Sequence, residues 1–182
     1  MKFLKIFLGI IVVIIAIILI GSLFLPKTFS VSRSANIAAS DTVVYKNIAD
    51  FDNFLQWNPW SKMDPKAKVD ISGTPEQVAH KYHWTGEESG EGEMTITSAT
   101  PYQQIKMDLK FIKPFESLAN VAFDLAKEGT STKVTWTMSG ENGIIGKWMC
   151  LVMGGMDKMI GKDFEAGLKS LKEKSELQQE NP

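Results

Sequence analysis

Few side chains of this chain have the type and spacing that catalysis requires. The two histidines, His80 and His83, lie three residues apart on a predicted strand. Their side chains therefore point to opposite faces of a sheet and cannot bind one metal ion together. The single cysteine, Cys150, excludes an internal disulfide and has no histidine near it in sequence. A free cysteine of this kind is typical of a buried structural thiol.

Two glycine-containing stretches also lack the order that ion binding needs. Residues 140–147 have the wrong glycine spacing for a phosphate-binding loop, and Trp148 stands where Ser or Thr would bind magnesium. The acidic loop at residues 86–92 lacks the Asp-x-Asx-x-Asx-Gly order of a calcium loop. We therefore expect no catalytic centre, no metal site and no cofactor, and we interpret the acidic loop as a solvated hairpin.

Apolar side chains give a stronger signal, and the chemistry they indicate is binding. Aromatic and methionine residues recur on the inward rows of the predicted strands and on the last helix, and methionine adapts to varied apolar ligands. The same rows suit an ordinary packed core, so core and pocket both remain open. The candidate ligand-binding residues are Arg33, Trp57, Trp60, Tyr82, Trp84, Met94, Met107, Phe111, Phe123, Trp136, Met138, Trp148 and Met156.

Two features bear on the choice between core and pocket. Arg33 falls in an apolar row, and a buried guanidinium needs a partner, which is either a carboxylate or a polar ligand head at a cavity mouth. The last helix contains Gly154, Gly155, Gly161 and Gly167, each of which costs about 1 kcal/mol relative to alanine. These glycines indicate either close approach to a sheet or free volume beside the helix.

The hydrophobic periodicity predicts the elements that position these residues. Alternation indicates strands near residues 29–37, 68–72, 80–84, 94–97, 105–111, 119–125 and 134–138. One short helix follows the N-cap Ser40, a second covers residues 51–56, and a long amphipathic helix covers 143–177. The order β-α-α-β6-α predicts an α+β domain in which a curved antiparallel seven-stranded sheet surrounds the C-terminal helix.

The first 25 residues differ from the rest of the chain. Lys2 and Lys5 precede 20 residues without a charge, and a helix of that length covers about 30 Å, one hydrocarbon core. A cleaved signal peptide usually has a shorter apolar region of about 7–15 residues and a small-x-small site, which is missing here. We expect a transmembrane anchor at residues 1–26, a domain at 27–178 and a disordered tail at 179–182.

The charge pattern indicates orientation and excludes one class of partner. The flanking lysines favour a cytoplasmic N-terminus, which makes this a single-pass membrane protein with a periplasmic or extracellular domain. Outside the anchor the chain has 18 basic and 21 acidic residues, a net charge of −3. No basic run follows a phosphate backbone, so we expect no nucleic-acid partner. The sequence indicates no particular oligomeric state.

Several stretches together resemble a known family. They are VSRSANIAAS (31–40), WNPW (57–60), GEGEMTI (90–96), KFIKPF (110–115), GTSTKVTWTMSGE (129–141) and MDKMIGKDFEAGLKSLK (156–172). In this order they are similar to the polyketide cyclase/dehydrase and lipid-transport group of the START-like, birch-pollen-allergen-like (SRPBCC) superfamily. The resemblance implies a helix-grip fold. It also implies that Trp57 and Trp60 either seal one end of the sheet or form the rim of a ligand entrance.

The resemblance and the residues lead to one expectation and two alternatives. We expect a membrane-anchored START-like domain that binds a hydrophobic small molecule or lipid between the sheet and the C-terminal helix. The first alternative is a cyclase- or hydrolase-like enzyme that uses the same pocket, for which only His80 and Arg33 are candidate acid–base groups. The second is a protein-interaction module with a filled core, as in co-chaperone relatives.

Overall fold

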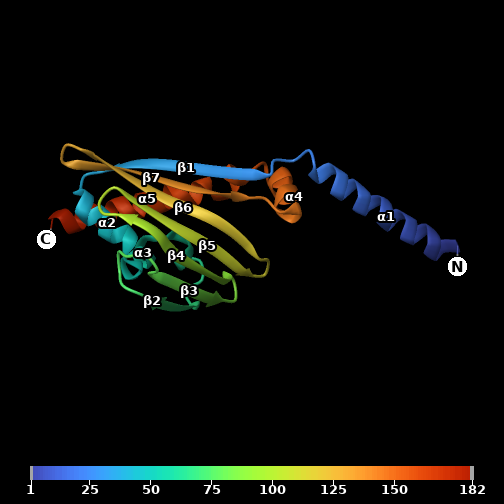
Figure 1. Cartoon of the computed structure of the whole chain (residues 1–182), viewed down its shortest axis with the longest axis horizontal. Helices are drawn as coiled ribbons and strands as arrows, with labels where there is room; N and C mark the ends of the chain where they lie inside the picture. Colours follow the sequence, from blue (N-terminus) through green and yellow to red (C-terminus); the bar gives the residue numbers. More distant parts are fainter. Residues whose placement is uncertain (1, 181–182) are drawn as a thin grey trace.

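Seven antiparallel strands form one sheet in the order β1-β7-β6-β5-β4-β3-β2 (Figure 1). The structure, a computed structural model, describes residues 2–180. Its strands are β1 (Thr28–Ile37), β2 (Lys68–Ser72), β3 (Lys81–Gly86), β4 (Gly90–Thr100), β5 (Gln104–Lys113), β6 (Ser117–Glu128) and β7 (Ser131–Glu141). Its helices are α1 (Lys2–Ser22), α2 (Asp41–Ala49), α3 (Phe51–Trp57), the 3-10 helix η1 (Pro59–Lys62), α4 (Ile144–Met153) and α5 (Met156–Glu180).

The two faces of the sheet differ as the alternation predicts. On β7, Val134, Trp136 and Met138 are buried, whereas the residues between them are partly exposed. On the outer face, hydroxyl groups pair between β1 and β7, with Ser32 Oγ 3.0 Å from Thr137 Oγ1. The inner face is therefore the apolar face, and it needs a cover.

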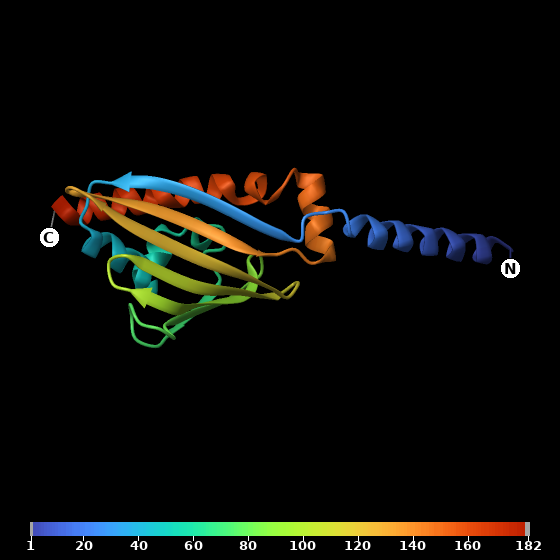
Figure 2. The same ribbon diagram turned by 45° about the horizontal axis from the view of Figure 1, so that its top comes forward.

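Helix α5 supplies most of that cover. It runs along the inner side of the curved sheet (Figure 2), and Phe164, Leu168 and Leu171 on its apolar stripe are at most 3% exposed. Helices α2 and α3 close the sheet at the end where β1 finishes. This arrangement is the helix-grip fold, and the predicted fold class is confirmed.

The predicted single helix over residues 143–177 is wrong in its middle. The chain forms two helices there, because Gly154 (φ 81°) and Gly155 (φ 104°) adopt left-handed backbone conformations that end α4. Glycine takes such conformations without the steric cost that a side chain imposes. At the other end, α5 continues to Glu180, so residues 179 and 180 are helical rather than part of a disordered tail. Residues 181 and 182 lie outside the described residues.

Gly161 and Gly167, which lie further along the chain in α5, allow this helix to approach the sheet closely. A Cβ at Gly161 would meet the guanidinium of Arg33. A Cβ at Gly167 would lie 2.8 Å from Cζ3 of Trp136 and 3.0 Å from Cδ of Pro59. Of the two explanations for helical glycine, close approach is therefore the one that applies at Gly161 and Gly167.

Helix α1 stands apart from the domain (Figure 1). Its segment Phe3–Ser22 has a mean hydropathy of 3.3, so it is long and apolar enough to cross a membrane. The segment is exposed along its length except at its end, where Gly21 is half-buried and Ser22 is buried. Helix α4 lies at the domain end of α1 and runs across its direction (Figure 2). We call this the α4 end of the sheet; it is where β1 begins, β7 finishes and the β5–β6 hairpin turns.

The close approach of Gly167 to the sheet leads to a testable prediction about stability. Gly167→Ala should lower the free energy of unfolding by about 1–3 kcal/mol through overpacking against the Trp136 ring and Pro59, despite the better helix propensity of alanine. The matched control is Gly146→Ala in α4, where the nearest atom, Asn142 Oδ1, would be 3.6 Å away. Urea unfolding of the full chain in detergent, followed by tryptophan fluorescence, measures both. Equal effects of the two substitutions would contradict close packing at Gly167.

Candidate functional site

The groove between the sheet and α5 is filled by aromatic rings in the half nearest α2 and α3. Trp136 stacks on Phe164 of α5 with ring centroids 4.1 Å apart, and on Phe123 at 5.1 Å. Trp57 meets the Trp136 ring edge-on at 5.7 Å. All four side chains are at most 1% exposed. We call this part of the groove the closed half, and in it the expected pocket is packed core.

The two tryptophans of the Asn-Pro turn have different positions. Trp57, at the end of α3, is buried and donates its Nε1–H to the carbonyl of Asn47 at 2.8 Å. Trp60 lies on η1, which Asn58 begins by accepting the Trp60 amide at 3.2 Å. The Trp60 ring is partly exposed and packs edge-on against Trp136 and Phe164. Trp57 therefore seals the closed half, and Trp60 forms its rim.

Toward the α4 end the groove is less completely covered. Tyr82, Trp84, Leu109 and Met138 keep 7–8% of their surface exposed, compared with 0–1% for the four stacked rings of the closed half. Leu125, at the closed end of β6, is also 8% exposed. Further inner-face side chains there are only half-buried. We call this region the groove mouth; it consists of Phe29, Tyr82, Trp84, Leu109, Phe111, Met138, Met156 and Ile160.

Three residues of the groove mouth, Phe29, Leu109 and Ile160, are not among the candidates predicted from the sequence. Phe29 and Leu109 lie in alternating inward rows, and Ile160 lies on the apolar stripe of the last helix, so each carried a signal. The candidate Met94 lies opposite Tyr82 and Leu109 of the groove mouth and is 4% exposed. Met107 is level with Met138 across β6 and is 1% exposed. Burial raises the pKa of the Tyr82 hydroxyl to about 12, so this side chain is neutral at physiological pH.

One buried polar group in the closed half lacks a partner. Trp136 Nε1 has no hydrogen-bond partner among the described residues, although the side chain is 1% exposed. An unsatisfied buried donor costs about 1–3 kcal/mol. The indole N–H is buried among the stacked rings, so the closed half carries this cost as part of its packing.

Arg33 forms ion pairs with α5. Its Nη1 lies 2.8 Å from Asp157 Oδ1, and its Nε lies 2.8 Å from Glu165 Oε1. The hydrogen bonds that Arg33 donates to Asp157 and Glu165 raise the pKa of the guanidinium, and the same bonds to Asp157 lower the pKa of that carboxyl. Of the two placements considered from the sequence, the carboxylate partner is confirmed. Arg33 fastens β1 to α5, and both carboxylates compete with any ligand head for its donors.

His80 is buried, at 1% exposure. Its Nε2 accepts the Phe51 amide at 3.1 Å, and its Nδ1 lies 3.0 Å from the Ser72 carbonyl oxygen. This network assigns the ring hydrogen to Nδ1, which donates to Ser72. Both nitrogens are therefore engaged by backbone groups. His83 lies on the outer face, away from His80, and its Nε2 is 3.5 Å from Oε1 of Glu91.

Asp64 fastens the acidic hairpin to the rest of the domain, a contact that sequence reasoning missed. One carboxylate oxygen accepts the amides of Glu88 and Ser89 at 3.1 and 3.0 Å and the Ser89 hydroxyl at 2.9 Å. The bonds from Ser89, followed by the Glu88 amide, lower the pKa of the Asp64 carboxyl. No local pattern pairs Asp64 with a loop more than 20 residues away. The hairpin between β3 and β4 is therefore held by Asp64, while Glu87 and Glu88 at its tip are exposed to solvent as predicted.

Trp148 is the candidate that the structure places elsewhere. Because Gly154 and Gly155 end α4, this helix turns away from the groove, and Trp148 meets α1 instead. Its Nε1 donates to the Ile18 carbonyl at 3.2 Å, and its ring lies against Gly21. The expectation that Trp148 lines the groove was wrong.

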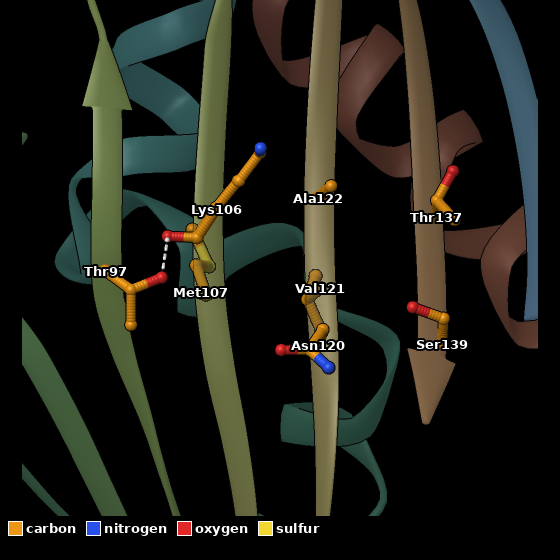
Figure 3. Close-up of a pocket in the computed structure, with 8 residues that line it drawn as sticks. All are labelled: Thr97, Lys106, Met107, Asn120, Val121, Ala122, Thr137 and Ser139. Atoms are coloured by element: carbon orange, nitrogen blue, oxygen red, sulfur yellow. Dashed lines mark hydrogen bonds between the residues drawn. The ribbon is translucent and has the colours of Figure 1, made fainter. Parts of the chain in front are cut away.

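Two hollows occur elsewhere on the described surface. One, of about 320 Å³, lies on the polar outer face of the sheet (Figure 3), where Thr97 donates to the Lys106 carbonyl at 3.3 Å. The other, of about 250 Å³, lies between the α1–β1 linker and α4. Neither lies between the sheet and α5. The described residues contain no cluster of three or more metal-binding side chains.

Comparisons with known proteins agree with this architecture. Residues 28–176 match the family model described as polyketide cyclase / dehydrase and lipid transport. Among solved structures, protein MLL2253 from Mesorhizobium loti is similar at 15% identity and a TM-score of 0.58, over 80% of this chain and 95% of that one. The Aha1 dimer from Colwellia psychrerythraea is similar at 19% identity and a TM-score of 0.57, over 81% and 96%. No curated protein matches the sequence. At these identities the structural similarity shows the fold alone.

The lowered pKa of Asp64 leads to a prediction about how stability depends on pH. Because its folded pKa lies below the usual value of about 3.9, its stabilising effect is complete above that pH and is lost as the pH falls through the folded pKa. Asp64→Asn should therefore lower the melting temperature at pH 7, and the difference from the native chain should shrink below about pH 4. Circular dichroism of the full chain in detergent measures this. The exposed Asp70→Asn serves as the control; a pH-independent deficit in Asp64→Asn would refute the assignment.

Proposed function

This chain belongs to the polyketide cyclase/dehydrase and lipid transport family, and from that premise we propose that its domain binds a lipid or another hydrophobic small molecule. The binding site is the groove mouth, where the inner face of the sheet meets the start of α5. Helix α1 anchors the domain to a membrane that supplies or receives the ligand.

The gradient of burial along the groove is the observation that carries this proposal. Trp57, Phe123 and Trp136 in the closed half are at most 1% exposed, whereas Trp84 and Met138 in the mouth are each 8% exposed. Phe111 and Met156 are partly exposed as well. The partly exposed inner-face side chains beside Met156 give an apolar ligand a point of entry at the α4 end.

Burial of apolar surface is enough to drive binding at such a site. Covering about 300 Å² of ligand surface yields about 7.5 kcal/mol before entropy costs, at about 25 cal/mol per Å². Met138 and Met156 adapt their shape to varied chains. No covalent step is required.

Membrane anchoring is supported by the character of α1. The segment Phe3–Ser22 combines sufficient length with a mean hydropathy of 3.3, and it is exposed up to Ile20. The lysines near its start favour a cytoplasmic N-terminus, which makes the domain periplasmic or extracellular. The net charge of −3 outside the anchor gives the domain no electrostatic attraction to anionic lipid, so α1 carries the attachment.

An enzymatic function receives less support. Its two candidate acid–base groups lie near opposite edges of the sheet, since Arg33 is on β1 and His80 directly precedes β3. Both nitrogens of His80 are engaged by backbone groups, and Arg33 is held by two carboxylates. Neither residue faces the other, so they form no convergent pair.

A protein-interaction module is the stronger alternative, because one half of the groove is filled. The stack of Phe123, Trp136 and Phe164 is what such a module needs, and the hollow of about 320 Å³ on the outer face is a docking feature outside the groove. This alternative requires that the groove mouth take up no ligand.

Photo-crosslinking separates the two functions. The full chain, reconstituted in phosphatidylcholine nanodiscs, is irradiated with diazirine-bearing palmitic acid, and modified residues are mapped by mass spectrometry. Ligand binding should modify Met138, which lies inside the groove mouth. Met156→Trp should reduce this modification several-fold, because the larger side chain occupies the half-exposed position of Met156.

The matched control is Val78→Trp, which adds an indole at an exposed position in the β2–β3 loop, at the other end of the strands. It should leave the modification of Met138 unchanged, and the melting temperature of each variant confirms folding. Modification confined to α1, or equal in both variants, would favour the interaction module.

A further inference from the structure

We infer that α4 is a second membrane-contacting element, which lies in the plane of the bilayer leaflet where α1 ends. This inference rests on the proposed anchoring by α1 and concerns a segment that the proposed function does not use. Its partner is a phospholipid surface, and it is identified by four features of α4.

The first feature is composition. The ten-residue sequence IIGKWMCLVM contains one charge, that of Lys147, and none of its residues is buried. Ten residues cover about 15 Å, which is too short to cross a bilayer. The exposed fractions are Ile144 46%, Ile145 58%, Met149 45%, Leu151 54%, Val152 83% and Met153 53%.

A surface of this kind needs an apolar environment. A helix that is apolar on all sides is normally buried in a core or in a membrane. Contiguous exposed apolar patches on proteins mark interaction sites. The domain itself does not cover α4, since Gly154 and Gly155 direct the chain from α4 into the separate helix α5.

The second feature is direct contact with the end of α1. Trp148 Nε1 donates to the Ile18 carbonyl at 3.2 Å, and Lys147 Nζ donates to the Ser22 carbonyl at 3.1 Å. The Trp148 ring packs on Gly21, where a Cβ would lie only 2.8 Å from Cζ2. These contacts fix α4 beside the last turn of the apolar segment. Helix α4 must therefore lie at the same depth in the bilayer as the last turn of α1.

The third feature is orientation. Helix α4 runs across the direction of α1 (Figure 2). If α1 follows the membrane normal, α4 lies parallel to the membrane surface. A short helix in this position buries its apolar sides about 5–10 Å into the boundary between headgroups and acyl chains.

The fourth feature is the placement of side chains suited to the interface. Tryptophan is enriched at the level of lipid headgroups, and lysine extends its charge from apolar surroundings toward water. Trp148 and Lys147 have these properties, and the Lys158 side chain lies along Gly154 at the end of α4. At the same end of the sheet, Phe115 in the β5–β6 hairpin is 64% exposed.

This placement has a consequence for the groove mouth. Met156, the first residue of α5, follows α4 after the two glycines, so a membrane-bound α4 holds the start of α5 at the bilayer surface. An apolar ligand then passes between the bilayer and the groove mouth without crossing bulk water.

Spin-label depth measurement tests the inference on the full chain in phosphatidylcholine vesicles. In a Cys150→Ser background, single labels are placed through Val152→Cys on α4, Val12→Cys in α1 and Val78→Cys in the β2–β3 loop, all at exposed positions. We expect the labels at positions 152 and 12 to collide with oxygen more often than the label at position 78 does. We also expect these two labels to collide with the water-soluble nickel chelate NiEDDA several-fold less often than the label at position 78.

The outcomes distinguish the inference from the anchoring on which it rests. A lipid-exposed label at position 12 with a water-exposed label at 152 would overturn the inference and leave the anchor intact. A water-exposed label at 12 would remove the anchor and the inference together. A label at 152 shielded from both reagents would mean that a second copy of the chain covers α4, which also overturns the inference.

Discussion

Close contact between α5 and the inner face of the sheet is the constraint on which the rest of this structure depends. The helix approaches so closely that Gly161 and Gly167 leave no room for a methyl group against Arg33 and Trp136. Arg33 then holds the two layers together through Asp157 and Glu165. The Arg33 side chain is 27% exposed, and its ion pairs act together with the glycines in fixing the helix position.

That contact divides the groove into two unequal halves. Where α5 lies nearest the sheet, the rings of Phe123, Trp136 and Phe164 stack and exclude any pocket. Toward α4 the helix begins only at Met156, and the inner face of the sheet is less covered. The break at Gly154 and Gly155 therefore decides where the groove opens as well as where the helix ends.

The break also connects the fold to the proposed membrane function. A continuous helix would have carried Trp148 along the groove, whereas the break turns it toward α1. The result is a continuous series of apolar surfaces from α1 through α4 to the groove mouth. Ligand entry, membrane contact and the end of the core thus all lie at one end of the sheet.

Alternation and amphipathic stripes were sufficient to predict the strands, their antiparallel order and the gripping helix, because these patterns follow from local geometry and the need to bury one face. The apolar run of α1 was likewise evident from the sequence alone. The distance between the sheet and α5 decides which inner-face residues are packed and which stay accessible, and the sequence patterns do not contain this distance. The partners of Arg33, the hairpin contact of Asp64 and the direction of Trp148 join residues far apart in the chain. Only the tertiary structure decides such pairings, because no local pattern encodes the distance between two elements.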